Sequence, residues 1–149
     1  MQVLLEQELF LQYAFLWLRP ASRPGREEPD LDVASARGGQ ANGLCGAAYP
    51  GVLSLVTATR TGYVPVRVEL HGAGPTVAAI WEDVVEVDLV VEDVDGTGSA
   101  PTQLASFDDG AELVLPAGRL RARWSARGMD SPRDGGGTGP SPERYLLQL

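Results

Sequence analysis

The chain contains no lysine, so all 12 of its basic residues are arginine. They are outnumbered by 20 acidic residues, which leaves a formal net charge of −8 at pH 7. An excess of negative charge repels phosphate backbones, so we expect no direct nucleic-acid binding. The same charge would attract a basic protein, which is the partner that we expect.

Cysteine and histidine are almost absent, with Cys45 and His71 as the single residue of each type. A lone cysteine excludes an intramolecular disulfide, and the chain has no Cys/His cluster with zinc spacing. We therefore expect no metal and no cofactor. Neither residue is surrounded by a sequence motif typical of a catalytic nucleophile and its general base. We therefore predict no catalytic residues and interpret Cys45 as a buried thiol. An enzyme that uses Cys45 with His71 is the remaining alternative.

The chain also lacks an apolar run long enough to cross a membrane. The run from Leu9 to Leu18 is too short to span a bilayer and is interrupted by Gln12. The first residues have no basic region of the kind that begins a secretory signal peptide. We therefore expect no membrane association and a location in the reducing cytoplasm.

Glycine and proline, by contrast, are abundant, with 18 and 11 residues. Turns between short strands use both residue types, so this composition favours an all-β fold. Alternation of apolar and polar residues indicates where the strands lie. For residues 3–18 it predicts one long bent strand or two strands in sequence, with a helix as the alternative. The other predicted strands are residues 52–56, 63–70, 81–91, 103–107, the hairpin 112–126 and 145–149.

About eight strands separated by turns predict an antiparallel β-sandwich with long loops, with residues 1–149 forming a single domain. Pro65 cannot donate a ladder hydrogen bond, which predicts an edge strand or a bulge at that position. The tryptophans lie on the apolar faces of their strands, so we expect all of them in the core. They are Trp17, Trp81 and Trp124.

Two of the predicted strands carry rows of opposite charge. Because successive side chains of a strand point to opposite faces, each row lies on one face of its strand. The basic row follows a Pro-Ala-Gly turn and consists of Arg119, Arg121 and Arg123. The acidic row consists of Glu82, Glu86 and Asp88. Either the two rows pair across one sheet, or the acidic row is free and forms a docking surface for a basic partner.

A second type of site is suggested by the loop that follows the acidic strand. Asp93 and Asp95 place carboxylates at alternate positions before Gly96, as calcium loops do, although the terminal glutamate of such loops is missing. This pattern leaves open a β-sandwich that binds calcium or a small ligand through loops 71–76 and 92–101.

Three segments of the chain resemble the competence protein J family. They are residues 51–68 (GVLSLVTATRTGYVPVRV), 113–124 (LVLPAGRLRARW) and 145–149 (YLLQL). The resemblance implies an all-β inhibitor that neutralises a nuclease of DNA uptake. These segments are strand patterns, so the resemblance assigns no inhibitory residues. Residues 81–87 (WEDVVEV) and 144–149 (RYLLQL) also resemble uncharacterised proteins of high-GC actinobacteria.

The sequence therefore favours a non-enzymatic protein-binding domain of the nuclease-inhibitor or immunity type. It would bind a basic protein through the acidic row defined above. The alternative is the small-ligand or calcium-binding sandwich. The sequence carries no signal for an oligomeric state.

Overall fold

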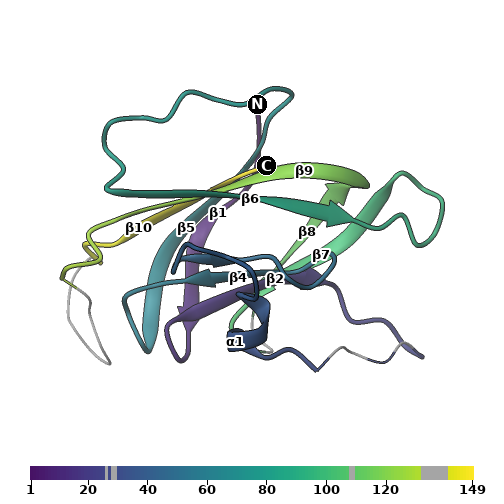
Figure 1. Cartoon of the computed structure of the whole chain (residues 1–149), viewed down its shortest axis with the longest axis horizontal. Coiled ribbons are helices and arrows are strands. Elements are labelled where there is room, and N and C mark those ends of the chain that lie inside the picture. The colour runs from purple at the N-terminus through teal and green to yellow at the C-terminus, as the bar shows by residue number, and fades with distance from the viewer. Residues whose placement is uncertain (26, 28–29, 108–109, 132–140) are drawn as a thin grey trace.

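The chain folds into two β-sheets packed face to face, as the computed structural model shows (Figure 1). The structure describes residues 1–25, 27, 30–107, 110–131 and 141–149. Within these residues, sheet 1 has the strand order β1 (Gln2–Leu11), β5 (Gly62–Leu70), β10 (Arg144–Gln148), β9 (Gly118–Arg127), β6 (Asp83–Val91). Sheet 2 has the order β3 (Cys45–Gly46), β4 (Leu53–Val56), β2 (Phe15–Pro20), β7 (Ser99–Ala105), β8 (Gly110–Pro116). The predicted all-β sandwich is confirmed, with more strands than the sequence indicated.

The strand pairings are antiparallel in both sheets, with one exception among the described strands. The last strand, β10, is inserted between β9 and β5 and runs parallel to β5. Because β5 is an interior strand, the prediction of an edge or a bulge at Pro65 is wrong. Pro65 pairs with Glu8 of β1, and the pairing with β10 begins only at Val66, so no ladder bond to β10 is lost at the proline.

Of the two predictions for residues 3–18, two strands in sequence is confirmed, and neither a single long strand nor a helix is present there. β1 belongs to sheet 1 and β2 to sheet 2, and Gln12 and Phe15 form an isolated bridge that closes the turn between them. Sequence alternation did not predict β3 or the one-turn helix α1 (Val33–Ala36). The helix is capped by Asp32, whose side chain accepts a hydrogen bond from Ser35 N at 2.8 Å. In the described parts of the chain, no helix has the length and apolar character needed to cross a membrane.

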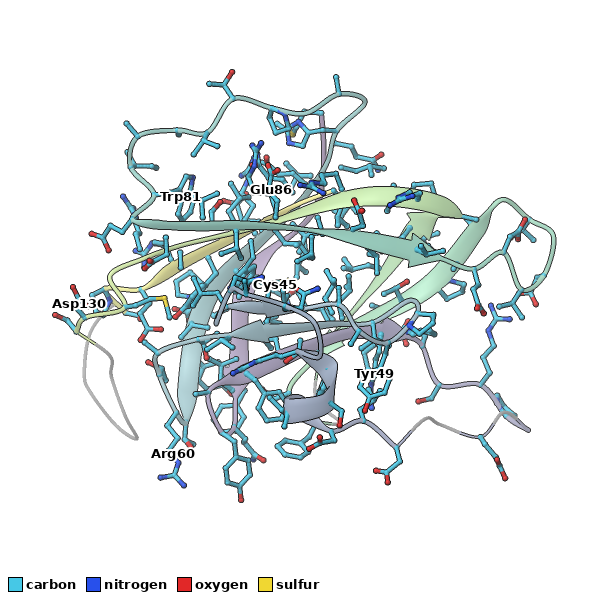
Figure 2. All side chains as sticks on the ribbon, viewed as in Figure 1. Cys45, Tyr49, Arg60, Trp81, Glu86 and Asp130 are labelled. Atoms are coloured by element: carbon cyan, nitrogen blue, oxygen red, sulfur yellow. The ribbon has the colours of Figure 1, made fainter. Side chains whose placement is uncertain are left out.

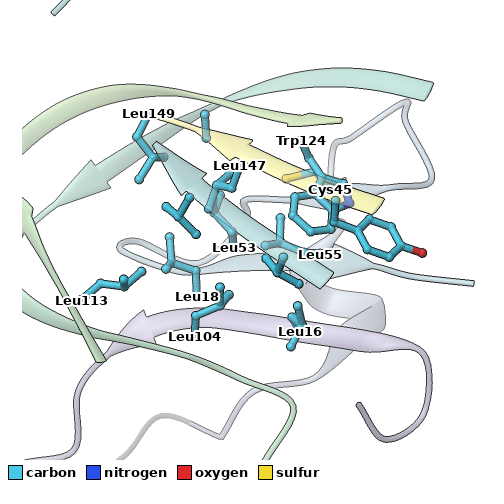
Figure 3. Packing of buried hydrophobic residues seen from close by; sticks show 14 of the residues in the cluster. Leu16, Leu18, Cys45, Leu53, Leu55, Leu104, Leu113, Trp124, Leu147 and Leu149 are labelled. Atoms are coloured by element: carbon cyan, nitrogen blue, oxygen red, sulfur yellow. The ribbon is translucent and has the colours of Figure 1, made fainter. Parts of the chain in front are cut away.

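One hydrophobic core lies between the sheets and takes side chains from both (Figure 3). The leucines of β2, β4, β7 and β8 face Trp124 of β9 and Leu147 of β10, and burying one such side chain contributes roughly 1.5–3 kcal/mol. Trp124, which is 0% exposed, lies in this core as expected, whereas Trp17, which is 5% exposed, is buried in a second cluster with Ala36 and Val52. Trp81 is only half-buried because it precedes β6, so the prediction of a core position is wrong for this residue. The single domain of residues 1–149 stays a prediction, which the shared core supports.

Candidate functional site

The acidic row and the arginine row are neighbours in sheet 1. β6 pairs with β9 so that Glu86 is opposite Arg123 and Asp88 is opposite Arg121. Asp88 forms ion pairs with Arg119 at 2.7 Å and with Arg121 at 3.0 Å. Glu86 forms ion pairs with Arg123 at 2.7 Å and with Arg121 at 3.3 Å. This part of the surface, where Figure 2 labels Glu86, therefore has mixed charge, and its acidic side chains are paired.

Glu82, the third residue of the predicted acidic row, lies apart from these ion pairs. It precedes β6, and its carboxylate accepts a hydrogen bond from Gly128 N at 2.7 Å. Its own N–H donates to Ala126 O at 3.0 Å. Glu82 therefore closes the end of the β6–β9 pair.

The polar contacts of Arg123 continue across the outer face of sheet 1. Arg123 donates to the side-chain oxygen of Gln148 on β10 at 3.4 Å, and Gln148 donates to Glu69 on β5 at 3.1 Å. Glu69 forms an ion pair with Arg67 at 2.7 Å, and Arg67 forms another with Glu6 on β1 at 2.6 Å. One network of charged and amide groups thus crosses all strands of sheet 1, from β6 to β1.

Glu86, Asp88 and Glu69 of this network have lowered pKa values, which favour their charged forms. The Arg123 guanidinium, followed by that of Arg121, lowers the pKa of Glu86 below its usual value. Arg119, followed by Arg121, does the same for the pKa of Asp88. Each carboxylate therefore contributes to the stability of the folded chain while it is ionised.

Glu69 has a more buried environment, and burial alone would raise its pKa. The hydrogen bonds from His71, Arg67 and Gln148 outweigh this effect and lower the pKa of Glu69. His71 Nε2 lies 2.8 Å from Glu69, so the single histidine belongs to this structural network.

Cys45 and His71, the residues of the enzyme alternative, are not brought together. Cys45 lies in the hydrophobic core, where its side chain is buried between the sheets (Figure 3), and burial raises the pKa of its thiol to about 12. His71 follows β5, and its ring contacts the side chains of Glu69 and Gln148. The geometry supports the interpretation of Cys45 as a buried thiol.

The carboxylates of the loop for which calcium binding was left open, Asp93 and Asp95, are also used within the protein. Asp93 accepts a hydrogen bond from Gly98 N at 3.1 Å, and Asp95 forms an ion pair with Arg23 at 2.5 Å. No group of three or more Asp, Glu, His or Cys side chains that could hold a metal occurs among the described residues. This loop therefore offers no calcium-binding set of carboxylates within the described part of the chain.

A cavity of about 650 Å³ opens at the end of the sandwich that carries this loop. Its walls come from the ends of β2, β6 and β8, the start of β7, the described residues after β2 and the segment before β4. Apolar walls include Pro20, Val52, Val91 and Leu115, and Arg19 and Arg23 lie among the polar ones. The predicted ligand loop 92–101 contributes to the cavity, but loop 71–76 does not: there, Pro75 O accepts a hydrogen bond from Arg123 over sheet 1.

Sequence reasoning missed an aromatic cluster at the other end of the sandwich. Tyr13 in the β1–β2 turn is 63% exposed, and Phe107, after β7, is 44% exposed. Their ring centroids are 5.8 Å apart, and Phe15 lies 5.9 Å from Phe107. The Arg60 guanidinium, in the β4–β5 turn, lies 5.9 Å from the Tyr13 ring centroid. We call Tyr13, Phe15, Arg60 and Phe107 the aromatic tip; Figure 2 shows Arg60 pointing away from the ribbon there.

Only the fold could reveal this tip, because its members come from segments that are far apart in the sequence. The sole local signal is the run of aromatic residues at Phe10, Tyr13 and Phe15, which sequence alternation had placed in one strand or two. Tyr13 lies in neither strand, and its backbone leaves the β region.

A solved structure with the same fold exists. The crystal structure of ComJ, inhibitor of the DNA degrading activity of NucA, from Bacillus subtilis is similar to this chain with a TM-score of 0.59. The sequence identity is 16%, and the similarity covers 99% of this chain and 95% of that chain. The resemblance to competence protein J is therefore confirmed at the level of the fold. No family model and no curated protein matches the chain.

Proposed function

We propose that this chain, which shares its fold with ComJ, is a non-enzymatic protein of the nuclease-inhibitor or immunity type. The observation that carries the proposal is the similarity to an inhibitor over 99% of the chain. Because a fold by itself does not determine function, the proposal also needs support from the chemistry of the chain.

The candidate catalytic residues support a binding role. The thiol of Cys45 is buried and, with a pKa of about 12, stays protonated at neutral pH, so it is a poor nucleophile. His71, the only imidazole that could activate it, contacts Glu69 instead. A single buried thiol is also compatible with the cytoplasm, which is the location that we propose.

The net charge supports a basic protein as the partner. A charge of −8 attracts a basic protein over a distance. Such long-range attraction increases the association rate more than it increases the binding affinity. Nucleases bind phosphate backbones, and their clefts are therefore basic. Contact of such a partner with Glu82, Glu86 and Asp88 stays a proposal. Since Glu86 and Asp88 already pair with arginines, a partner would gain few new ion pairs there.

Degradation of DNA provides the direct test. The purified chain is titrated into plasmid digestion by NucA and by an extract of the cells that produce the chain. We expect digestion to stop at a fixed ratio of chain to nuclease, and the association rate to fall as salt is added. If the chain at high concentration protects DNA from neither source, the proposal is wrong.

The cavity favours a second candidate, the binding of a small ligand. Its volume of about 650 Å³ is within the range of small-molecule pockets, and its walls combine apolar side chains with a few polar groups. The fluorescent anion anilinonaphthalene sulfonate is a suitable probe. Binding that is lost in a folded Ala21→Trp variant, which adds a large ring to a half-buried position of the cavity wall, would support this candidate, and an absence of binding by the folded chain would contradict it.

A further inference from the structure

We propose that the aromatic tip is the surface that enters the partner, and that it fits the concave nucleic-acid cleft of a nuclease. This inference rests on the proposed function and assigns it to a surface. Its starting point is the backbone of the turn that carries Tyr13.

Tyr13 and Ala14 both have a φ of 61°, in the left-handed region that L-residues seldom occupy. A two-residue turn with both central residues at positive φ is normally built from Asn and Gly. A tyrosine and an alanine here are strained, and such strain persists where the surrounding structure enforces it, often at binding sites. In this turn the phenol ring of Tyr13 is 63% exposed at the end of the sandwich.

Hydrogen bonds from both neighbouring turns hold this conformation. Ala14 N donates to Arg60 O at 3.1 Å, and Ala14 O accepts from Thr57 N at 3.0 Å. On the other side, Ser106 Oγ donates to Phe15 O at 2.5 Å and accepts from Gln12 N at 3.2 Å. The tip is thus built before a partner arrives, and a surface that is already ordered loses less entropy on binding.

A buried carboxylate supports the tip from behind. Glu143 is fully buried and accepts hydrogen bonds from Thr59 N at 3.2 Å, from the Thr59 hydroxyl and from the Tyr145 hydroxyl. The same Tyr145 oxygen accepts from Ala58 N at 2.8 Å. These bonds fix the β4–β5 turn that carries Arg60, so Glu143 is a positioning residue for the tip.

The chemistry of the tip indicates the kind of partner. Tyrosine and arginine are enriched among residues that dominate the energy of protein interfaces, and exposed aromatic rings supply much of their contact area. The exposed side chains of Tyr13 and Phe107 and the Arg60 side chain, which points away from the ribbon, lie at one end of the sandwich, where a concave partner can enclose them. A nucleic-acid cleft offers flat stacking surfaces for the rings of the tip. Its basic groups attract the chain as a whole, whose net charge is −8, while the tip itself contributes the rings and Arg60.

The role of this surface is tested by comparing two variants of its rings with a matched control variant elsewhere on the surface. Tyr13→Ala and Phe107→Ala remove the two exposed rings. Ile80→Ala is the control, since Ile80 is 57% exposed but lies in the loop between β5 and β6. Each variant is checked for folding by thermal unfolding and is then titrated into the digestion of plasmid DNA by NucA and by the cell extract.

We expect Tyr13→Ala to weaken inhibition about 30-fold, which is the effect of losing a hot-spot residue, and Ile80→Ala to inhibit like the wild type. We also expect an excess of DNA to relieve inhibition, because the tip and DNA would compete for one cleft. If both ring variants inhibit as well as the wild type, or if DNA has no effect on inhibition, this inference is wrong while the proposed function stands. A wild-type chain that inhibits neither source contradicts both.

Discussion

Glu86 on β6 and Arg123 on β9 occupy the same register position of sheet 1, and their side chains form an ion pair at 2.7 Å. This pair joins the acidic row to a network that continues through Gln148 to β5 and β1. β6 is an edge strand, and charges along such a strand also oppose pairing with another chain. The main role that the geometry supports for these charges is therefore within the sheet.

The Glu86–Arg123 pair makes a testable contribution to acid stability. The pKa of Glu86 is lower in the folded chain than its usual value of 4.5. The pair therefore adds to the free energy of unfolding above pH 4.5, and this stabilisation is lost as the pH falls through the pKa of Glu86 in the folded chain. Glu86→Gln should lower the free energy of unfolding by up to about 1 kcal/mol at neutral pH, since the pair is partly exposed. Urea unfolding of the variant should differ from the wild type less at about pH 3 than at about pH 7. Glu112→Gln, at an exposed position of β8, is the control, and a Glu86→Gln effect that grows in acid would contradict this prediction.

Glu143 provides a test of the buried network behind the tip. Glu143→Gln replaces an oxygen that accepts hydrogen bonds with an amide group that donates them, so a buried donor loses its partner. We expect the free energy of unfolding to fall by about 1–3 kcal/mol in chemical denaturation. Inhibition should also weaken, because the β4–β5 turn is less well ordered. A variant as stable as the wild type would show that these hydrogen bonds are unimportant.

Cys45 should be unreactive in the native protein. Its burial and its pKa of about 12 leave almost no thiolate at neutral pH. We expect a thiol reagent such as Ellman's reagent to label Cys45 slowly in buffer and at once in denaturant. Rapid labelling of the native chain would revive the alternative of a Cys45 enzyme.

The strained turn predicts that Ala14→Gly stabilises the chain. Glycine adopts a φ of 61° without the steric penalty of roughly 1–2 kcal/mol that an L-residue meets there, and part of this gain is offset by the greater freedom of glycine in the unfolded chain. Thermal unfolding should therefore occur at a higher temperature. Because the Tyr13 ring stays in place, inhibition should be unchanged. A lower unfolding temperature would mean that the turn is not strained.

The strands were predictable where one face is buried and the other exposed. In residues 119–124 every apolar side chain faces the core and every arginine faces out, so alternation alone located β9 and the hairpin. Alternation failed for α1 and β3, because they are too short for a period to show. The prediction for Pro65 also failed. This interior strand tolerates the proline because the pairing with β10 starts one residue later.

The sequence by itself determined the fold class and the two charged rows, because these depend on local periodicity and on composition. Only the tertiary structure decided that β6 lies beside β9, so that Glu86 and Asp88 are paired with arginines, and that Tyr13, Arg60 and Phe107 meet at one end of the sandwich. Both results depend on strand order and on contacts between turns distant along the chain. No local pattern encodes such contacts, because packing of the whole core selects the arrangement that buries every apolar face at once.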